Sequence, residues 1–505
     1  MPKLAEEISK LQSEDDEFLK KFGSFSINAE KSISGELTVA REKTSLYLQD
    51  DEYFDLLQLP DNCILGVLND RTKVSLHQCI SSGTGSYSSK DDRYNFANIF
   101  PHYIIYGDYH LTPTEDKISE VHFRIDDAST LFYDFDAFGS ISNANNLIND
   151  IVSVNEKLTG RKIETGPNAQ ICYFAGKRKI FESDTVFGII SANHSPNYSM
   201  GGPDGVHIKN RIYITIKFKK LTKFNDAINS ILITLRYFEL LIGRTQNLFD
   251  VYLSLPFEKS THYLPVYFTL PHTRNASRAE ERNPHPSDIL LDAVSNHEIF
   301  SKVFANWLER DSDWSDARLR FFESFSDQRY GINRLINCAN MFDILPNSAV
   351  PSDVELSDDL KNAKNSCSNI FTKLDNSIER DSILGALGRL GKSNLKQKIR
   401  HRVKIITNVI GVTFPDLNFV TDAAVNCRNH YVHGSCGDFR YNENFNAVVF
   451  FTNTLEFVFA ISDLIESGWD AKVWIGTGTV MSHPFGAYKV NYGLCLNNLK
   501  ELMKN

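Results

Sequence analysis

Apolar and polar residues alternate over short stretches in the first half of the chain, which is the pattern of half-buried β-strands. The stretches Ile64–Leu68 and Lys73–Leu76 flank a polar run and predict a β-hairpin. Apolar residues recur at helical spacing in Phe224–Ile242, which predicts one helix. Further strands are expected at residues 33–39, 46–48, 103–106, 119–125, 170–174 and 211–218.

Polar segments interrupt this pattern and are interpreted as surface loops, where recognition often takes place. Residues 81–90 are rich in Ser and Gly, and residues 191–205 contain the run Met-Gly-Gly-Pro-Asp-Gly. The segment His272–Ser287 is polar and carries two prolines. We interpret that segment as a linker or inter-domain loop.

Beyond this linker the apolar positions follow helical spacing. The last long helix is apolar nearly all round, which is typical of a helix buried in a bundle. The predicted helices cover residues 289–310, 316–342, 357–374, 394–410, 417–433 and 444–466. The expected fold class is therefore α+β, with a helical extension at 1–25, a β-rich domain at 26–285 and an all-α bundle at 286–505.

Composition narrows the class of protein. Of the 505 residues, 42% are hydrophobic and 23% are charged, as in soluble globular proteins. The eight cysteines include no C-x-x-C pair and are typical of reduced thiols in a cytoplasmic protein. Residues 1–21 are charged and lack an apolar signal region, and we expect no apolar run that reaches a membrane span.

The net charge of −9 means that binding of nucleic acid would need a local basic patch. Such a patch is present, because no acidic residue occurs between Asp381 and Asp416. The patch suits an RNA phosphate backbone, although a solvated helix face explains it equally well. The candidate RNA-binding residues are Lys392, Lys396, Lys398, Arg400, Arg402 and Lys404, with His430 from the next helix.

The candidate catalytic residues, Arg428, Asn429 and His433, lie at the end of the predicted helix 417–433. Arginine neutralises a phosphate oxyanion and histidine transfers protons near neutral pH. RNA supplies its own nucleophile, the 2′-hydroxyl, so this chemistry requires no metal and no cofactor. An arginine and a histidine five residues apart also occur often by chance, so the spacing by itself is a weak signal.

Helical geometry affects whether the side chains of Arg428 and His433 can meet. At 100° per residue, Arg428 lies about 140° around a straight helix from His433, which separates the two side chains. The length of arginine, the end of the helix at Gly434, or a second copy of the motif from a partner subunit must complete the site. The helix dipole favours a charged His433 and hence a general acid. Tyr431 continues a stripe that is expected to face the core.

Two other patterns are discounted. The cysteines and histidines of the run 427–436 occur at steps of three, which spreads them too widely around a helix for tetrahedral zinc. Asp134-Phe135-Asp136 resembles a metal-binding D-x-D motif, but it stands in an aromatic run whose strand alternation explains the spacing. A metal-dependent enzyme using Asp134 and Asp136 remains an alternative that loss of activity in EDTA would reveal.

The motif and its helical setting resemble a HEPN domain, whose signature is an arginine, a polar residue, a few further residues and a histidine. Together with the β-rich segments 33–37, 65–68 with 74–76, and 103–107 with 121–125, the chain resembles the ApeA-type anti-phage proteins. The resemblance implies a metal-independent endoribonuclease of abortive infection, which dimerises through its HEPN domain and cuts cellular RNA such as tRNA. It also implies that the β-rich domain is a sensor, with a phage protein as its trigger.

Each candidate residue has a role in this reading. His433 acts as general base on the 2′-hydroxyl or as general acid on the leaving 5′-oxygen, and Arg428 stabilises the phosphorane charge. Asn429 orients His433 or the phosphate. The alternative is a non-catalytic HEPN-dimer scaffold whose β-rich domain recognises a ligand or a protein.

Overall fold

The computed structural model describes residues 19–28, 31–51, 62–88, 93–199, 201–203, 205–258, 260–270, 283–327, 329–352 and 356–504. The chain divides into two compact units, Met1–Leu308 and Glu309–Asn505. The first is β-rich and the second is helical, which confirms the α+β class. The division differs from the boundary expected at 285/286, because α5 (His297–Glu309) packs its aromatic residues within the first unit.

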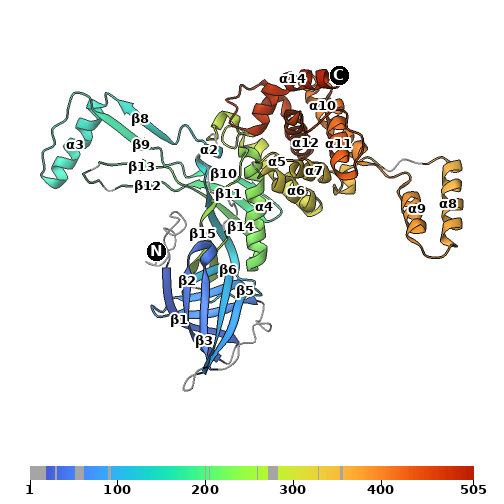
Figure 1. Cartoon of the computed structure of the whole chain (residues 1–505). Coiled ribbons are helices and arrows are strands. Elements are labelled where there is room, and N and C mark those ends of the chain that lie inside the picture. The colour runs from blue at the N-terminus through green and yellow to red at the C-terminus, as the bar shows by residue number, and fades with distance from the viewer. Residues whose placement is uncertain are drawn as a thin grey trace. The chain divides into compact units, whose positions relative to one another are not determined.

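Within the described residues the first unit is built on one antiparallel sheet of 12 strands. Its order is β10-β11-β14-β7-β15-β16-β6-β3-β2-β1-β4-β5, and an additional β5–β6 pairing closes the last six strands into a barrel (Figure 1). The strands are β1 (Leu19–Asn28), β2 (Lys31–Val39), β3 (Ser45–Asp50), β4 (Ile64–Leu68), β5 (Lys73–Ser88), β6 (Arg93–Gly107), β7 (Ile118–Ile125), β10 (Lys179–Asp184), β11 (Gly188–His194), β14 (Ile212–Thr222), β15 (Leu248–Phe257) and β16 (Ser260–Phe268).

The barrel has an apolar core of its own. The alternating residues of β2 and β3 point inward, so that Leu37, Leu46 and Leu48 are buried against Phe25. Gly66 faces the Phe25 ring so closely that a Cβ atom at this position would collide with it. The predicted hairpin at 64–76 is confirmed as β4 and β5, which pair from Ile64 with Leu76 to Val67 with Lys73.

Three expectations for this unit are wrong in part. Residues 19–25 of the expected helical extension belong to β1, and residues 1–18 lie outside the described residues. The Ser- and Gly-rich segment 81–88 is not a loop, because β6 pairs with it as far as Ser88. The expected loop 191–205 begins inside β11 and contains β12 (Asn197–Tyr198), which pairs with β13 (Ile208–Lys209). The expected linker 272–287 lies outside the described residues up to 282.

Helix α4 (Phe224–Ile242) has the predicted bounds and is buried along most of its length. Its Tyr237 ring lies 4.8 Å from the ring of Phe304 and 5.3 Å from that of Trp307, both on α5. The remaining elements of this unit are α2 (Ala128–Leu131), β8 (Phe138–Ser142), α3 (Asn145–Thr159) and β9 (Gln170–Phe174).

The second unit is a helical bundle around α12 (Phe445–Glu466), which packs against α6, α7, α10, α11 and α14. The predicted helix 316–342 is two helices, because the first ends at Phe325 and the second begins at Ile332. The helix predicted from residue 289 begins only at His297. The other helices are α6 (Asp311–Phe325), α7 (Ile332–Asn340), α8 (Asp358–Thr372), α9 (Ile378–Arg389), α10 (Leu395–Ile410), α11 (Leu417–His433), α13 (Ala471–Gly476) and α14 (Pro484–Leu502).

Helix α12 is long and apolar enough to cross a membrane by length and composition, contrary to the expectation that no segment qualifies. Of its most apolar window, 83% is buried inside the protein, as in the core helix of a bundle. Its buried acids are paired with buried arginines: Glu456 lies 2.9 Å from Arg334, and Asp463 lies 3.0 Å from Arg318. The prediction of a buried helix at 444–466 is confirmed.

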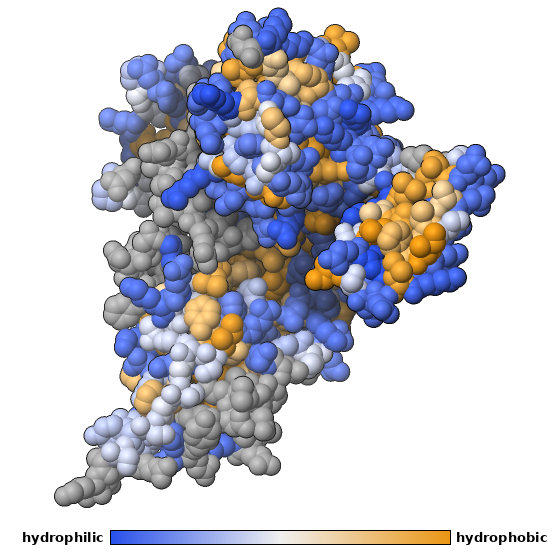
Figure 2. Space-filling view, turned by 45° about the vertical axis from the view of Figure 1, so that its right-hand side comes forward, coloured by the Kyte–Doolittle hydropathy of each residue, from blue (hydrophilic) through white to orange (hydrophobic). Residues whose placement is uncertain are grey.

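Helices α8 and α9 form a hairpin in which no residue is buried. Figure 2 shows apolar residues gathered on one face of this hairpin. The exposed large apolar residues of these two helices and their connection include Leu360, Ile370, Leu374, Ile378 and Ile383.

Candidate active site

The candidate motif stands at the C-terminal end of α11. Val420, Ala424 and Cys427 are buried on one side of this helix and fix its orientation in the bundle. Gly434 adopts a left-handed conformation with φ of 67°, and its N–H donates to the carbonyl of His430 at 3.0 Å. The helix therefore ends directly after His433, as a glycine at this position predicts.

The guanidinium of Arg428 is the centre of a polar cluster. Its Nη1 lies 3.2 Å from Nε2 of His433 and also donates to Oδ1 of Asn429 at 3.2 Å. Its Nη2 donates to Oδ1 of Asn340 at 2.8 Å. Arg428 and Asn429 are half-buried and His433 is exposed, so the cluster opens to solvent at the histidine.

Of the three ways expected to complete the site, the length of the arginine side chain is the one that unites Arg428 and His433. An arginine side chain is long enough to curve around the last turn of α11, and Asn340 at the end of α7 holds it in that direction. One chain thus brings both groups within hydrogen-bond distance. A second subunit is not needed to unite Arg428 and His433.

The contact with Arg428 bears on the role of His433. A guanidinium only donates, so a hydrogen bond at this contact uses Nε2 of His433 as the acceptor, with the ring proton on Nδ1. In that tautomer Nε2 is suited to accept a proton, as a base does, whereas the helix dipole argument favoured an acid.

Asn340 is the member of the cluster that sequence reasoning missed. It lies 88 positions before Arg428 in the chain and on another helix. No local pattern connects the two residues, and only the packing of α7 against α11 brings them together.

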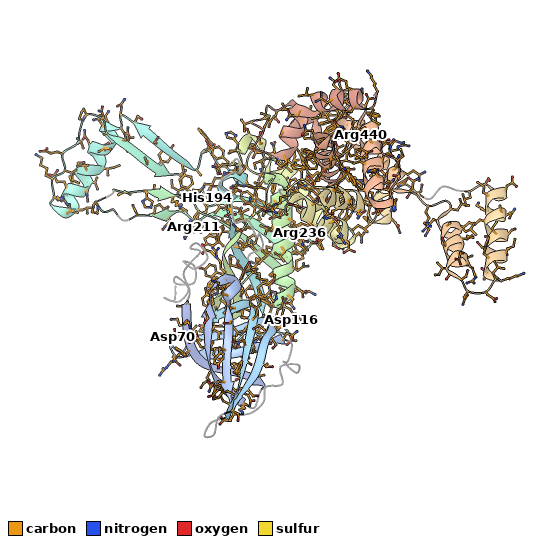
Figure 3. All side chains as sticks on the ribbon, in the orientation of Figure 1. Asp70, Asp116, His194, Arg211, Arg236 and Arg440 are labelled. Atoms are coloured by element: carbon orange, nitrogen blue, oxygen red, sulfur yellow. The ribbon has the colours of Figure 1, made fainter. Side chains whose placement is uncertain are left out.

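An aromatic group lies beside the motif. The ring of His430 is 5.1 Å from Tyr431 and 5.4 Å from Tyr441, and Phe439 is 4.7 Å from Tyr441. His430, Phe439 and Tyr441 border a pocket of about 470 Å³ that also includes Arg440, which Figure 3 labels. Tyr431 is half-buried and its hydroxyl donates to Asn442 at 2.9 Å, so its expected place in the core is wrong.

The cysteines and histidines of the run 427–436 have separate environments. Cys427 is buried, and burial raises the pKa of its thiol to about 12, which keeps the sulfur protonated. Nδ1 of His430 lies 2.7 Å from the carbonyl of Ser435, to which it donates. Cys436 is exposed.

Several side chains of the expected basic patch already have partners within the bundle. Nε of Arg400 donates to Asp422 at 3.0 Å, Nζ of Lys396 donates to Asn426 at 2.6 Å, and Nζ of Lys398 donates to the carbonyl of Asp343 at 2.8 Å. Lys392 and Lys404 are exposed, and no described side chain pairs with either.

Arg402 is not available to RNA, so that prediction is wrong. It is fully buried, donates from Nε to Ser462 at 2.9 Å, and lies 2.8 Å from Glu466. Its guanidinium is also stacked over Trp314, with 4.9 Å between the guanidinium carbon and the ring centroid. Arg402 belongs to the charged core of the bundle.

Asp134 and Asp136 lie in a turn, so strand alternation does not explain their spacing. The N–H of Asp136 donates to Oδ1 of Asp134 at 3.2 Å. Asp134 is buried and lies 2.8 Å from Lys177 and 3.7 Å from His194. Burial raises the pKa of the Asp134 carboxyl, but Lys177 outweighs this effect and the net shift is downward.

Comparison with known protein families shows which family the chain belongs to. The family model ApeA N-terminal domain 1 matches residues 20–307, and the model Apea-like HEPN matches residues 336–473. The second match contains the whole cluster, from Asn340 to His433. Neither the curated proteins nor the solved structures contain a match.

Proposed function

Because the chain belongs to the ApeA family and carries an Apea-like HEPN domain, we propose that it is a metal-independent endoribonuclease of anti-phage defence. HEPN domains are typically ribonucleases, which supports a nuclease of this general kind. The finer proposal is an abortive-infection effector that cuts cellular RNA such as tRNA. The observation that carries it is the distance of 3.2 Å between Nη1 of Arg428 and Nε2 of His433.

The proposed reaction uses the 2′-hydroxyl of the RNA as nucleophile. Nε2 of His433 accepts the hydroxyl proton while the 2′-oxygen forms a bond to the adjacent phosphorus. The bond from phosphorus to the 5′-oxygen breaks, and that oxygen takes up a proton from a general acid. The products are a 2′,3′-cyclic phosphate and a 5′-hydroxyl, and no water enters this step.

Arg428 has two tasks in this proposal. Without substrate it donates to Nε2 of His433, and with substrate its planar fork of donors turns to the phosphate oxygens. That movement frees the lone pair of Nε2 for the 2′-hydroxyl. Arg428 then stabilises the negative charge that develops on the phosphorane.

The two asparagines are proposed to position this arginine. Asn340 and Asn429 both accept hydrogen bonds from its terminal nitrogens, which limits the directions that the guanidinium takes. Both remain neutral at all pH values, so they orient the arginine without cancelling its charge.

A homodimer remains part of the proposal, because HEPN domains commonly dimerise and bind RNA. One His433 serves as base in the first half of the reaction, and a His433 from a second copy is suited to protonate the leaving oxygen. The exposed Lys392 and Lys404 are the proposed contacts to the RNA backbone.

The test is an RNA-cleavage assay with total cellular RNA and with purified tRNA in the presence of EDTA. We expect wild type to cleave, and His433→Ala and Arg428→Ala each to lose about 100-fold or more in rate. The matched controls are His207→Ala and Arg320→Ala, two exposed residues outside the cluster. Equal cleavage by wild type and both cluster variants would favour a non-catalytic scaffold, and loss of wild-type activity in EDTA would favour a metal enzyme.

A further inference from the structure

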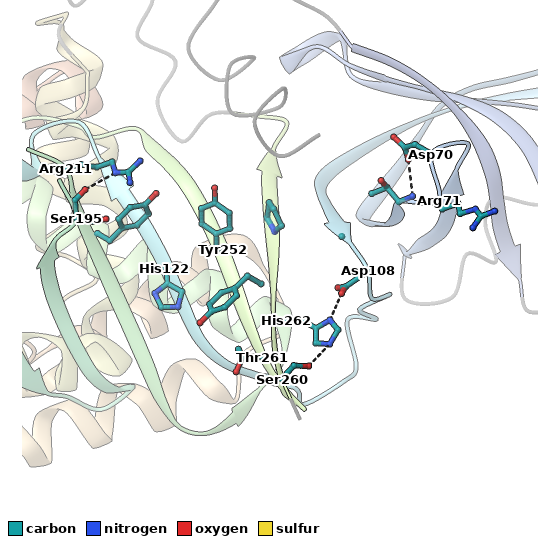
Figure 4. Close-up of a pocket in the computed structure, with 15 residues that line it drawn as sticks. Asp70, Arg71, Asp108, His122, Ser195, Arg211, Tyr252, Ser260, Thr261 and His262 are labelled. Atoms are coloured by element: carbon teal, nitrogen blue, oxygen red, sulfur yellow. Dashed lines mark hydrogen bonds and ion pairs between the residues drawn. The ribbon is translucent and has the colours of Figure 1, made fainter. Parts of the chain in front are cut away.

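A second pocket lies in the first unit, within the β-rich fold and apart from the HEPN cluster. It has a volume of about 870 Å³, which is within the range of cavities that hold small molecules. Four adjacent strands, β7, β14, β15 and β16, supply most of its lining (Figure 4). Neighbouring strands of one sheet form a rigid support for a binding site.

The carboxylates of this lining are engaged with partners. Asp108 lies 2.8 Å from Nδ1 of His262, and Asp70 accepts from the N–H of Thr72 at 3.0 Å. Asp250, beside the pocket, lies 2.7 Å from Arg124. Asp70 also lies 3.7 Å from Nζ of Lys21, so each of these carboxylates has a partner of its own.

Arg211 differs from these groups. Its Nε donates to the carbonyl of Ser195 at 3.1 Å, which fixes the direction of the side chain. Among the described residues, none accepts from its two terminal nitrogens, and none of the acids lies within ion-pair distance. Figure 4 shows the guanidinium at one side of the pocket. A fixed arginine with unoccupied donors is suited to an anion.

Three tyrosine rings line the same pocket as this arginine. Tyr213, Tyr252 and Tyr263 come from β14, β15 and β16, and all three line the pocket. Tyr263 is 60% exposed, and its ring lies 6.1 Å from that of His122. The guanidinium carbon of Arg211 lies 5.4 Å from the centroid of Tyr213. An exposed aromatic ring in the same pocket as an arginine suits a flat ligand ring that carries a negative group.

We propose that this pocket binds a nucleotide, with its base on the tyrosine rings and its phosphate on Arg211. Stacking of a base on an aromatic side chain is tolerant of base identity, and arginine pairs with phosphate oxygens through two parallel hydrogen bonds. Thr261 lines the same wall and its hydroxyl can serve the sugar or the base, whereas the hydroxyl of Ser260 already lies 3.3 Å from Nε2 of His262. This inference concerns the β-rich domain and does not depend on the proposed ribonuclease activity.

Two sources supply this chemistry: a free mononucleotide, or the 5′-phosphate end of a nucleic acid chain. Isothermal titration calorimetry of the full chain distinguishes them. The ligands are 5′-AMP, 5′-UMP, adenosine, inorganic phosphate, and a pentamer of thymidine with and without a 5′-phosphate. The DNA pentamer lacks the 2′-hydroxyl, so a ribonuclease does not consume it.

We expect both mononucleotides to bind at least tenfold more tightly than adenosine or phosphate. Arg211→Ala is expected to weaken 5′-AMP binding about tenfold or more, and Arg161→Ala, an exposed arginine outside the pocket, to leave it unchanged. Tyr263→Ala is expected to weaken binding about tenfold, because stacking is lost. Its matched control is Tyr198→Ala, which changes a tyrosine that is 52% exposed and lies outside the pocket.

The two sources give different results. Tighter binding of the 5′-phosphorylated pentamer than of 5′-AMP identifies a chain end, and the reverse order identifies a free nucleotide. If no nucleotide binds detectably at a concentration of about 1 mM, the proposal is overturned. Equal affinity of wild type and the Tyr263→Ala variant, whose exposed ring is not needed for folding, overturns it as well.

Discussion

The guanidinium of Arg428 lies 3.2 Å from Nε2 of His433, although the two residues are five positions apart on one helix. On an ideal helix their Cβ atoms point about 140° apart. The contact exists because the arginine side chain follows the last turn of α11 and the carbonyl oxygen of the Asn340 amide holds its other end. The distance between the two groups therefore depends on a residue of a different helix.

Replacement of Asn340 by alanine tests this dependence. A hydrogen bond to a charged group contributes about 1.5–3 kcal/mol, so we expect Asn340→Ala to lower kcat for RNA cleavage about tenfold or more. KM and the melting temperature are expected to stay close to wild type, since Asn340 is only half-buried. Asn337→Ala on the same helix is the control. An unchanged kcat would show that Arg428 does not need this partner.

Replacement of the two exposed lysines tests the RNA-binding surface. Lys392→Gln combined with Lys404→Gln is expected to weaken binding of single-stranded RNA by a catalytically inactive variant. Each neutralised phosphate contact contributes about 0.7 to the slope of log K against log salt, so the slope is expected to fall by about 1.4. Affinities measured at several salt concentrations give this slope. An identical slope for the double variant would place RNA binding on another surface.

The buried pair of Arg334 and Glu456 is expected to stabilise the bundle. Both oxygens of Glu456 accept from Arg334 at 2.9 Å, and Ser324 donates to the same carboxylate at 2.9 Å. Glu456→Ala leaves the arginine charge buried and unpaired, which costs about 3–5 kcal/mol of unfolding free energy. Chemical denaturation measures this loss.

The exposed pair of Arg320 and Glu323 is the comparison for that variant. Glu323→Ala is expected to change the unfolding free energy by less than about 1 kcal/mol, because exposed ion pairs contribute little. Similar losses from Glu456→Ala and Glu323→Ala would contradict the role of the buried pair.

His77 in the barrel is expected to make stability depend on pH. It is fully buried, its Nε2–H donates to the carbonyl of Leu111 at 2.8 Å, and burial lowers its pKa from 6.5 to about 4. Between pH 6.5 and about pH 4, the unfolded chain therefore binds a proton at His77 that the folded chain does not bind. Stability from the neutral ring is fully present above pH 6.5 and is lost as the pH falls towards 4.

Comparison of wild type with His77→Gln isolates this effect from other titrating groups. The contribution of the shift is about 2 kcal/mol between pH 7 and pH 5. Wild type is expected to lose that much more unfolding free energy over this interval than the glutamine variant, as measured by urea denaturation. Equal losses in both proteins would show that His77 is protonated in the folded barrel.

The sequence predicted those helices whose apolar spacing or terminal glycine defines them. The bounds of α4 follow from its apolar spacing, and those of α11 follow from Gly434 at its C-terminal end. The segment 81–88 was predicted to be a loop because its residues favour turns. Its strand conformation depends on β6, whose hydrogen bonds outweigh that preference.

In the candidate site, too, the sequence predicted the local motif but not the contacts that depend on packing between helices. Arg428, Asn429 and His433 were recognised because their chemistry is present in six consecutive residues. The contribution of Asn340 and the burial of Arg402 depend on the packing of α7, α10 and α12, which no local pattern encodes. The angle between two positions on a helix gives the directions of their Cβ atoms. It does not predict how far a long side chain such as that of Arg428 extends.

The most direct measurement for the whole account is a single-turnover cleavage of RNA, followed by mass spectrometry of the product ends. The substrate is compared with the same RNA carrying a 2′-deoxy nucleotide at the cleaved position. The account predicts 2′,3′-cyclic phosphate and 5′-hydroxyl ends, no cleavage of the deoxy substrate, and no cleavage by His433→Ala. Cleavage of the deoxy substrate, or full activity of His433→Ala, would contradict it.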